Sequence, residues 1–228
     1  MKKVAFFDID KTIYNTHSFF QLAEYEIRKG GVKQETWDKI QKLLVRYKSG
    51  ELTYSVTANM LLEDFASDLK DQKYIDLIED VKEFFVSNLK NFYPYFEEIL
   101  SKLKETHDIY IITTNAQYVT KTIVDHFGLT GFISSEFEVI DGLFTGKVLK
   151  SLANGKSMVS DILTKYGKNG SIAVGDSEND IGMLELVEYP VCISPSEELK
   201  KHASSNNWVM TDPDQATKIF NTILDSIK

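Results

Sequence analysis

Four aspartates that could share one cation lie in two short polar segments of the chain. Asp8 and Asp10 are two residues apart, and Asp176 and Asp180 are four apart. Carboxylates this close repel each other, and a divalent cation removes that conflict. Ligands that are all oxygen suit magnesium rather than zinc. A carboxylate held at such a cation can attack phosphorus to form an aspartyl-phosphate, and a second one can act as acid and base.

A third polar segment offers donors for a phosphate group. Thr113, Thr114 and Asn115 follow an apolar run and precede a predicted helix. Their hydroxyl and amide groups, together with the backbone N–H groups at the start of that helix, could form a phosphate pocket. The plain alternative is a helix N-cap, a position where Thr and Asn are favoured in any case.

A basic group is also needed to neutralise phosphate oxygens and to orient the nucleophile. Lys156 stands at the opening of a predicted helix and is the first candidate. The plain alternative is a solvated surface lysine, which is what most lysines are. Lys147 and Lys150 are the fallback candidates for the same role.

Each polar segment comes directly after a short apolar run of the kind that forms a strand buried on both faces. Such runs lie at 4–7, 109–112, 171–174, 191–193 and 208–210. Helical patterns alternate with them at 95–106, 116–127, 154–166, 178–186, 196–204 and 213–227. This alternation predicts an α/β fold with a doubly wound parallel, Rossmann-like sheet. Ligands bind at the carboxyl edge of such a sheet, so the polar segments are expected to converge there.

Residues 16–89 break the alternation, because they contain no run typical of a buried strand. Amphipathic stretches lie instead at 18–29, 34–48, 53–66 and 70–89. The apolar stripe at 74–89 has helical spacing and is interpreted as the core of the insert rather than a cofactor site. We therefore predict a catalytic core formed by 1–15 and 90–228, with an all-helical cap domain at 16–89. The Asp-Gly pair within 136–146 predicts a β-hairpin.

The composition is that of an ordinary globular protein, and it narrows the choice of partners. The chain has 228 residues, 43% of them hydrophobic, and a formal net charge of −8. Nucleic-acid binding is not expected, because it needs a basic surface. The single cysteine, Cys192, is expected to be a small buried apolar residue. No run is long enough to span a bilayer, and the apolar start breaks at Asp8, so no membrane partner and a cytoplasmic location are expected.

The motifs, taken in order along the whole chain, resemble the haloacid dehalogenase-like (HAD) superfamily, and most closely its phosphoserine phosphatase-like branch. The resemblance implies a phosphatase that acts on a small phosphorylated metabolite, with Mg²⁺ as cofactor and a helical cap inserted after the first motif. It also implies that Asp8 is the nucleophile and a magnesium ligand, and that Asp10 is the general acid and base and binds magnesium through its backbone carbonyl. Thr113, or else Thr114, would bind phosphate, and Lys156 would stabilise the phosphate and the nucleophile. Asp176 would ligate the metal, and Asp180 would hold a metal-bound water.

The cap differs from that of true phosphoserine phosphatases. Those enzymes use a cap glutamate and a cap arginine for the substrate amine and carboxylate, whereas this chain has His17 and Asn59 near those places. The candidate substrate contacts in the cap are therefore His17, Arg46 and Asn59, with Tyr14 and Asn15 as further guesses. The expected substrate is a phosphate monoester other than phosphoserine, which is kept as an alternative. The sequence does not indicate an oligomeric state.

Three other activities compete on the same scaffold. Dehalogenases of the superfamily lack an acid at the position of Asp10, because halide leaves without a proton, so Asp10 argues against that activity. A phosphomutase or phosphotransferase shares all the motifs. A noncatalytic binding protein would be favoured by the loss of Asp8 or Asp10, and both are present.

Overall fold

A seven-stranded sheet in the order β4-β3-β2-β1-β5-β6-β7 forms the centre of the computed structural model, which describes residues 2–227. The strands are β1 (Lys3–Phe7), β2 (His107–Ala116), β3 (Gly131–Ile140), β4 (Leu143–Lys150), β5 (Ile172–Gly175), β6 (Tyr189–Ile193) and β7 (Val209–Thr211). Neighbouring strands are parallel except for β3 and β4, which form the predicted hairpin at one edge of the sheet. The predicted α/β fold is therefore confirmed.

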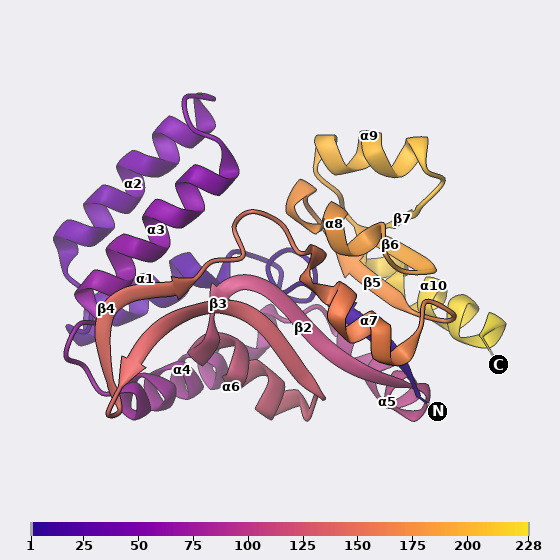
Figure 1. Ribbon diagram of the computed structural model, residues 1–228, viewed down its shortest axis with the longest axis horizontal. Helices are drawn as coiled ribbons and strands as arrows, with labels where there is room; N and C mark the ends of the chain where they lie inside the picture. Colours follow the sequence, from indigo (N-terminus) through magenta and orange to yellow (C-terminus); the bar gives the residue numbers. More distant parts are fainter. Residues whose placement is uncertain (1, 228) are drawn as a thin grey trace.

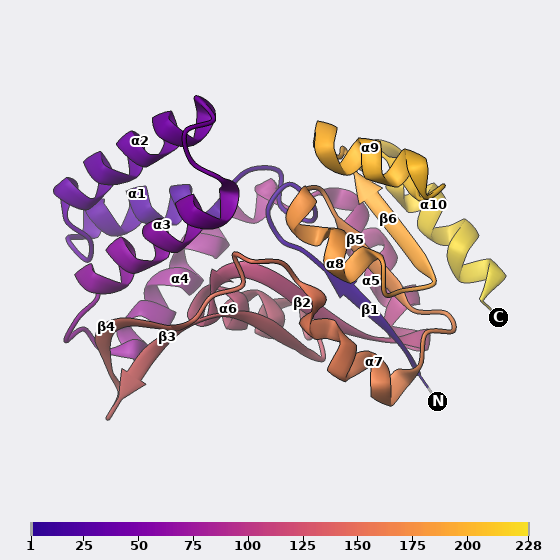
Figure 2. The same cartoon turned by 45° about the horizontal axis from the view of Figure 1, so that its top comes forward.

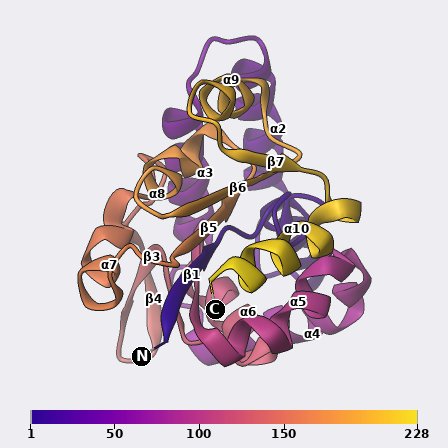
Figure 3. The ribbon, with the colours of Figure 1, turned by 90° about the vertical axis from the view of Figure 1, so that its right-hand side faces the viewer.

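Helices cover both faces of the sheet, as a strand buried on both sides requires. One face carries α5 (Pro94–Thr106), α6 (Gln117–Phe127) and α10 (Pro213–Ser226), and the other carries α7 (Ser160–Tyr166), α8 (Ile181–Leu184) and α9 (Glu197–Ser205). Figure 3 shows α7 and α8 on one side of β1 and β5, with α5 and α10 on the other. Successive side chains of β1 point to opposite faces, so Phe7 joins one hydrophobic cluster and Phe6 the other. Among residues 2–227, no helix combines the length and apolarity that crossing a membrane needs.

Four helices follow β1 before α5 leads the chain back to the sheet, in agreement with the predicted helical insert. They are α1 (Ser18–Lys29), α2 (Gln34–Lys48), α3 (Tyr54–Asp68) and α4 (Tyr74–Asn88). Figures 1 and 2 show α2 and α3 at the end of the molecule that carries the β3–β4 hairpin, away from α9 and α10. The helix α4 begins four residues later than predicted. The backbone N–H groups of Asp71 and Tyr74 instead bond to the carbonyls of Phe144 and Gly142 at the hairpin.

The apolar stripe of α4 is not the core of the insert alone, which corrects that expectation. Phe84 contacts Tyr25 of α1, with ring centroids 5.6 Å apart. Its neighbour Phe85 faces Tyr14 and Phe92 outside the four helices, at 6.0 and 5.9 Å. The insert therefore shares one continuous hydrophobic cluster with one face of the sheet. Where the insert ends and the rest of the chain begins is not marked by a separate core.

Two helices predicted beside the polar segments are shorter than expected. The pattern at 154–166 gives a 3₁₀ turn at Ser157–Val159 before α7, and the pattern at 178–186 gives a 3₁₀ turn at Glu178–Asp180 before α8. A 3₁₀ turn is tighter than an α-helical one and is common where a helix begins. Both turns lie next to polar side chains of the sheet edge, which are described below.

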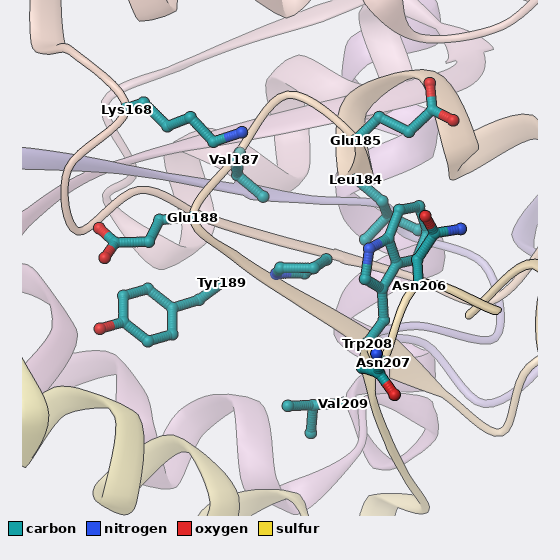
Figure 4. A pocket seen from close by; sticks show the side chains of 11 residues that line it. Lys168, Leu184, Glu185, Val187, Glu188, Tyr189, Asn206, Asn207, Trp208 and Val209 are labelled. Atoms are coloured by element: carbon teal, nitrogen blue, oxygen red, sulfur yellow. The ribbon is translucent and has the colours of Figure 1, made fainter. Parts of the chain in front are cut away.

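A cavity of about 350 Å³ lies at the edge where β6 and β7 begin. Figure 4 shows the side chains of Lys168, Glu188 and Tyr189 on one side of it and those of Glu185 and Trp208 on the other. None of the polar residues that the sequence singles out lines this cavity. The chemistry that the sequence predicts therefore belongs to the opposite edge of the sheet.

Candidate active site

The three polar segments converge at the carboxyl edge of three adjacent strands. Asp8 follows β1, Thr113 lies near the end of β2, and Asp176 follows β5, and the sheet places these strands side by side in the order β2-β1-β5. A cavity of about 530 Å³ opens between this edge and the helical insert. Every core residue that the sequence predicts for the site lines it, apart from the fully buried Asp180: Asp8, Asp10, Thr113, Thr114, Asn115, Lys156 and Asp176.

Lys156 lies in the floor of the cavity and bonds to two carboxylates. Its side chain is 2% exposed, and Nζ donates to Oδ1 of Asp8 and, at 2.7 Å, to Oδ1 of Asp180. Burial by itself lowers the pKa of Lys156, but the charges of Asp180 and Asp8 raise it above its ordinary value. Burial raises the pKa of Asp8 to about 7, against the opposing charge of Lys156. The lysine therefore stays protonated and orients Asp8.

Asp180 is fixed from both sides and does not reach the cavity. Its Oδ2 accepts hydrogen bonds from the backbone N–H groups of Asp176 (2.9 Å) and Ser177 (3.0 Å). Its carboxylate also lies against Gly175, where an added Cβ would stand 2.4 Å from Cγ of Asp180. Glycine is therefore required at position 175 for Asp180 to occupy this place. The resemblance gave Asp180 an indirect role at the cation, and this position beneath the surface agrees with it.

Asp176 is the carboxylate whose surroundings best fit a cation. Oxygen atoms of Asp8, Asp176 and Asp180 lie within 4.8 Å of one another. The Asp176 side chain has no hydrogen-bond or ion-pair partner among residues 2–227. Burial, followed by the charges of Asp180 and Asp8, raises its pKa to about 9. An unpaired and largely buried carboxylate is costly unless a positive charge neutralises it, and a hard divalent ion such as Mg²⁺ would do so.

The loop after β1 is held by its own backbone. The N–H groups of Ile13 and Tyr14 both donate to the carbonyl of Ile9, at 2.9 Å. Lys11 has a φ angle of 60°, in the left-handed region that residues other than glycine rarely adopt. Such a conformation persists where the surrounding structure fixes it, and here the N–H of Lys11 donates to the carbonyl of Tyr14 at 2.7 Å.

Asp10 is tied to the first residue of the insert. Its Oδ1 accepts from the backbone N–H (2.9 Å) and from Oγ (2.6 Å) of Ser18, which begins α1. Asp10 thus supplies the acceptor that the N-cap residue His17 does not provide with its side chain. Asn115, predicted to bind phosphate, donates its amide to Oγ of Ser18 at 3.1 Å. Sequence reasoning missed Ser18, although its place at the start of the predicted helix was a signal.

The two threonines of the second segment make different contacts. Oγ1 of Thr113 accepts from the backbone N–H of Asn115 at 3.3 Å, so its hydroxyl proton remains available to a bound phosphate. Oγ1 of Thr114 bonds to the hydroxyl of Tyr54 and to the amide of Asn179, both at 3.2 Å. Thr113 is therefore the better placed phosphate donor, whereas Thr114 links the edge of the sheet to the insert.

Of the predicted substrate contacts in the insert, His17 lines the cavity but Arg46 and Asn59 do not. Arg46 pairs with Glu51 at 2.7 Å. Helical spacing explains why Arg46 and Asn59 miss the cavity, because only one face of α2 and one face of α3 line it. The lining residues are Leu44, Tyr47 and Lys48 on α2, and Tyr54, Thr57, Ala58, Leu61 and Leu62 on α3. Tyr14 and Asn15 do not line the cavity either.

The fallback lysines Lys147 and Lys150 lie on β4 outside the cavity, and Lys150 faces Glu136 at 3.7 Å. The cavity has further lining residues that sequence reasoning did not select. They are Phe19, Phe20, Leu44, Tyr47, Lys48, Tyr54, Thr57, Ala58, Leu61, Leu62, Ser177, Glu178, Asn179 and Ser196. Several of them lie in predicted helices, but without the fold the face that they share could not be chosen.

Comparison with known proteins agrees with this geometry. The model of the haloacid dehalogenase-like hydrolase family matches residues 5–185, a range that contains all the polar segments. A histidinol-phosphatase from Neisseria meningitidis serogroup C is 28% identical over an alignment 225 positions long, which covers 91% of this chain and 97% of that protein. The chain therefore belongs to the haloacid dehalogenase-like hydrolase family, and the predicted class, an enzyme similar to phosphatases, is confirmed.

Solved structures share the fold. A protein of unknown function from Bordetella pertussis Tohama I superposes with a TM-score of 0.76 at 24% identity, covering 93% of this chain and 99% of that one. A phosphoserine phosphatase in a phospho-aspartyl intermediate analogue form superposes with a TM-score of 0.67 at 20% identity, covering 96% of this chain and 98% of that one. A phosphoserine phosphatase is thus among the solved structures that share the fold of this chain.

Proposed function

We propose that the protein is a magnesium-dependent phosphatase that hydrolyses a small phosphate monoester through an aspartyl-phosphate on Asp8. The observation that carries this proposal is the arrangement of Lys156 between Asp8 and Asp180 in the floor of a cavity. A buried ammonium group fixes the nucleophile and also offers positive charge to a phosphate dianion. A structural ion pair would not need the additional unpaired carboxylate of Asp176 beside it.

The proposed cation fits the oxygen donors of this site. Asp8 and Asp176 would hold it directly, with the backbone carbonyl of Asp10 as a further ligand and Asp180 behind them. Bound magnesium would offset the charge of the phosphate oxygens during attack and departure. All of these ligands are oxygens, which is the ligand type that magnesium prefers.

The side chains of the floor divide the reaction between them. Lys156 holds one oxygen of Asp8, so that the other oxygen can attack phosphorus. Thr113 donates its hydroxyl proton to a phosphate oxygen. Asp10 has one oxygen fixed by Ser18 and no partner for Oδ2 among the described residues. That oxygen gives its proton to the departing alkoxide and later takes one from the water that attacks the aspartyl-phosphate.

The choice of substrate rests on the insert. The relative from Neisseria meningitidis is named a histidinol-phosphatase, and structural neighbours are phosphoserine phosphatases. Histidinol phosphate and phosphoserine therefore belong in the first panel, with glycerol phosphate as an uncharged alcohol. A phosphomutase or phosphotransferase would use the same floor, and it is distinguished by phosphate passing to an acceptor other than water.

Release of inorganic phosphate from p-nitrophenyl phosphate and from the panel tests the proposal. We expect turnover with magnesium and none after chelation. Asp8→Asn should lower kcat by about 1000-fold or more, because the nucleophile is lost. Asp161→Asn, an exposed aspartate of α7, is the matched control and should keep full activity. Equal turnover by Asp8→Asn and the parent protein would contradict the proposal.

A further inference from the structure

The charges that line the cavity are unbalanced in a way that concerns the alcohol part of the ester. Four carboxylates (Asp8, Asp10, Asp176 and Glu178) and two ammonium groups (Lys48 and Lys156) line it, a formal charge of −2. The proposed magnesium ion would offset this charge, and the phosphate dianion of a bound substrate would restore it. Lys156 already bonds to Asp8 and Asp180. That leaves Lys48, on the exposed surface of α2, as the lysine available to a second negative group on the substrate.

No arginine adds to this supply of positive charge. The chain has two arginines, and neither lines the cavity. Arg46 is held by Glu51 at 2.7 Å. A substrate carboxylate would therefore meet a mostly negative surface without a guanidinium group, the side chain best shaped to bind it.

Glu178 is the lining carboxylate that the proposed reaction does not use. It is half-buried in the 3₁₀ turn Glu178–Asp180, and its Oε2 accepts from Oγ of Ser196 at 3.0 Å. Its Oε1 has no partner among residues 2–227. Ser196 thus holds one oxygen in place and leaves the other free for a donor.

The wall of the same cavity on the side of the insert is largely apolar. Phe19 and Phe20 of α1, Leu44 of α2, and Leu61 and Leu62 of α3 line the same cavity. Such a wall excludes water, and charge interactions are stronger where water is excluded. It fits a hydrocarbon or aromatic body, and a bare polar alcohol would leave it uncovered.

We propose that the cavity selects phosphate esters whose alcohol carries an apolar body and a protonated amine but no carboxylate, and that Glu178 is the specificity-determining residue that binds the amine. This inference rests on the phosphatase activity proposed above and adds the substrate class. A protonated amine supplies N–H donors to the free oxygen of Glu178 and offsets the negative charge of the cavity. A carboxylate on the same alcohol adds repulsion, and Lys48 is the one lining lysine that Asp8 and Asp180 do not already hold.

Two synthetic esters that differ only in the amine test the inference: 2-amino-3-phenylpropyl phosphate and 3-phenylpropyl phosphate. We expect the parent protein to show a kcat/KM at least about tenfold higher for the amine-bearing ester, the size of one charge-assisted hydrogen bond. Glu178→Gln keeps the shape and removes the charge, and it should lower that ratio roughly tenfold. Glu198→Gln is the matched control, because Glu198 also lies near Tyr47 but does not line the cavity. In this variant the ratio of the two kcat/KM values should stay unchanged.

Three results on active protein overturn the inference, and a fourth is the absence of turnover of both esters. One is equal kcat/KM for the two esters, and another is an unchanged ratio in Glu178→Gln. The third is a preference for phosphoserine over phosphoethanolamine that disappears in Lys48→Met. Phosphoserine differs by its carboxylate, so this result would show that Lys48 binds a carboxylate in the cavity. If p-nitrophenyl phosphate is hydrolysed but neither phenylpropyl ester is, the inference alone fails. If p-nitrophenyl phosphate is not hydrolysed either, the proposed function fails with it.

Discussion

The floor and the wall of the cavity are built in different ways. The floor consists of Asp8, Asp10, Thr113, Lys156 and Asp176, with Asp180 directly beneath it. The wall consists of Phe19, Phe20, Leu44, Tyr47, Tyr54, Leu61 and Leu62. In the floor, hydrogen bonds between residues far apart in the sequence join Lys156 to Asp8 and to Asp180, and Asp10 is held by Ser18 at the start of α1. The wall is made largely of half-buried apolar groups. The reacting geometry is therefore set by the floor, whereas the wall can change without disturbing it.

Few polar contacts join the two regions. The hydroxyl of Tyr54 bonds to Thr114 at 3.2 Å, and Ser55 donates to Asn154. The Asp10–Ser18 bonds anchor α1 at the opposite side of the cavity. A floor that is held tightly under a loosely joined wall suits an enzyme whose chemistry is fixed and whose substrate differs from one relative to another.

Removing the lysine of the floor should have the largest effect. We expect Lys156→Met to lower kcat on p-nitrophenyl phosphate by about 1000-fold or more, because the phosphate and Asp8 lose their shared cation. It should also destabilise the fold by about 3–5 kcal/mol, since two buried carboxylates lose their partner. Lys147→Met, an exposed lysine of β4, is the control and should change neither kcat nor thermal unfolding. Equal losses in both variants would contradict the assignment.

Asp176→Asn separates metal binding from stability. The variant should need roughly 10–100-fold more magnesium for half-maximal turnover, because a ligand charge is lost. Without magnesium it should unfold at a higher temperature than the parent protein, because an unpaired buried carboxylate has been neutralised. Magnesium titrations followed by phosphate release and by thermal unfolding measure both effects. A variant that magnesium stabilises as much as the parent protein would remove Asp176 from the cation site.

The difference between floor and wall also explains what the sequence could predict. Asp8, Thr113 and Asp176 each end an apolar run, so the parallel sheet alone brings them to one edge. The contacts of Ser18 and Asn115 depend on where α1 begins relative to Asp10, which the loop with its left-handed Lys11 decides. No pattern along the chain contains that information.

The wall was harder to predict because a helix shows its contact face only after it is packed. Asn59 lies one residue beyond Ala58, which lines the cavity, and a step of one residue turns the side chain by about 100°. Spacing alone assigns the stripe of α4 to the insert, because it does not show that Phe85 meets Phe92 across the boundary. The fold class depends on alternation over the whole chain and was therefore the most secure prediction.

A buried carboxylate of the insert contrasts with those of the floor, because it should affect stability and not turnover. Glu26 of α1 is 1% exposed, and its Oε1 has no hydrogen-bond partner among the described residues. Burial, followed by the charge of Asp80, raises its pKa from 4.5 to about 7. The folded protein thus keeps a proton that the unfolded chain loses, so the free energy of unfolding falls as pH rises from about 4.5 to about 7.

Glu26→Gln should remove this fall. Above pH 7 we expect the variant to be more stable than the parent protein by about 1–2 kcal/mol, and below pH 4.5 to match it. Urea unfolding at several pH values measures the difference, and kcat on p-nitrophenyl phosphate should not change. Glu24→Gln, an exposed position on the same helix, is the control. A gain in stability that is the same at every pH would contradict the account.

The smallest effects are expected at the two positions of the insert that face away from the cavity. Arg46→Ala and Asn59→Ala should each change KM and kcat for the best ester of the panel by less than about twofold, the range of surface substitutions. Tyr54→Phe, which removes the bond to Thr114, is the comparison within the wall and should have a larger effect than either. A tenfold rise in KM for Asn59→Ala would return that residue to the substrate site.

The central claim is that a phosphoryl group passes through Asp8, and single-turnover labelling tests it most directly. The protein, in molar excess over a ³²P-labelled ester, is mixed with that ester and magnesium. The mixture is quenched in acid within one turnover, and the protein is digested for mass spectrometry. We predict label on the peptide that contains Asp8, its loss on further incubation before the quench, and none in Asp8→Asn. Rapid release of labelled phosphate without any labelled peptide, or label on a different residue, would contradict the account.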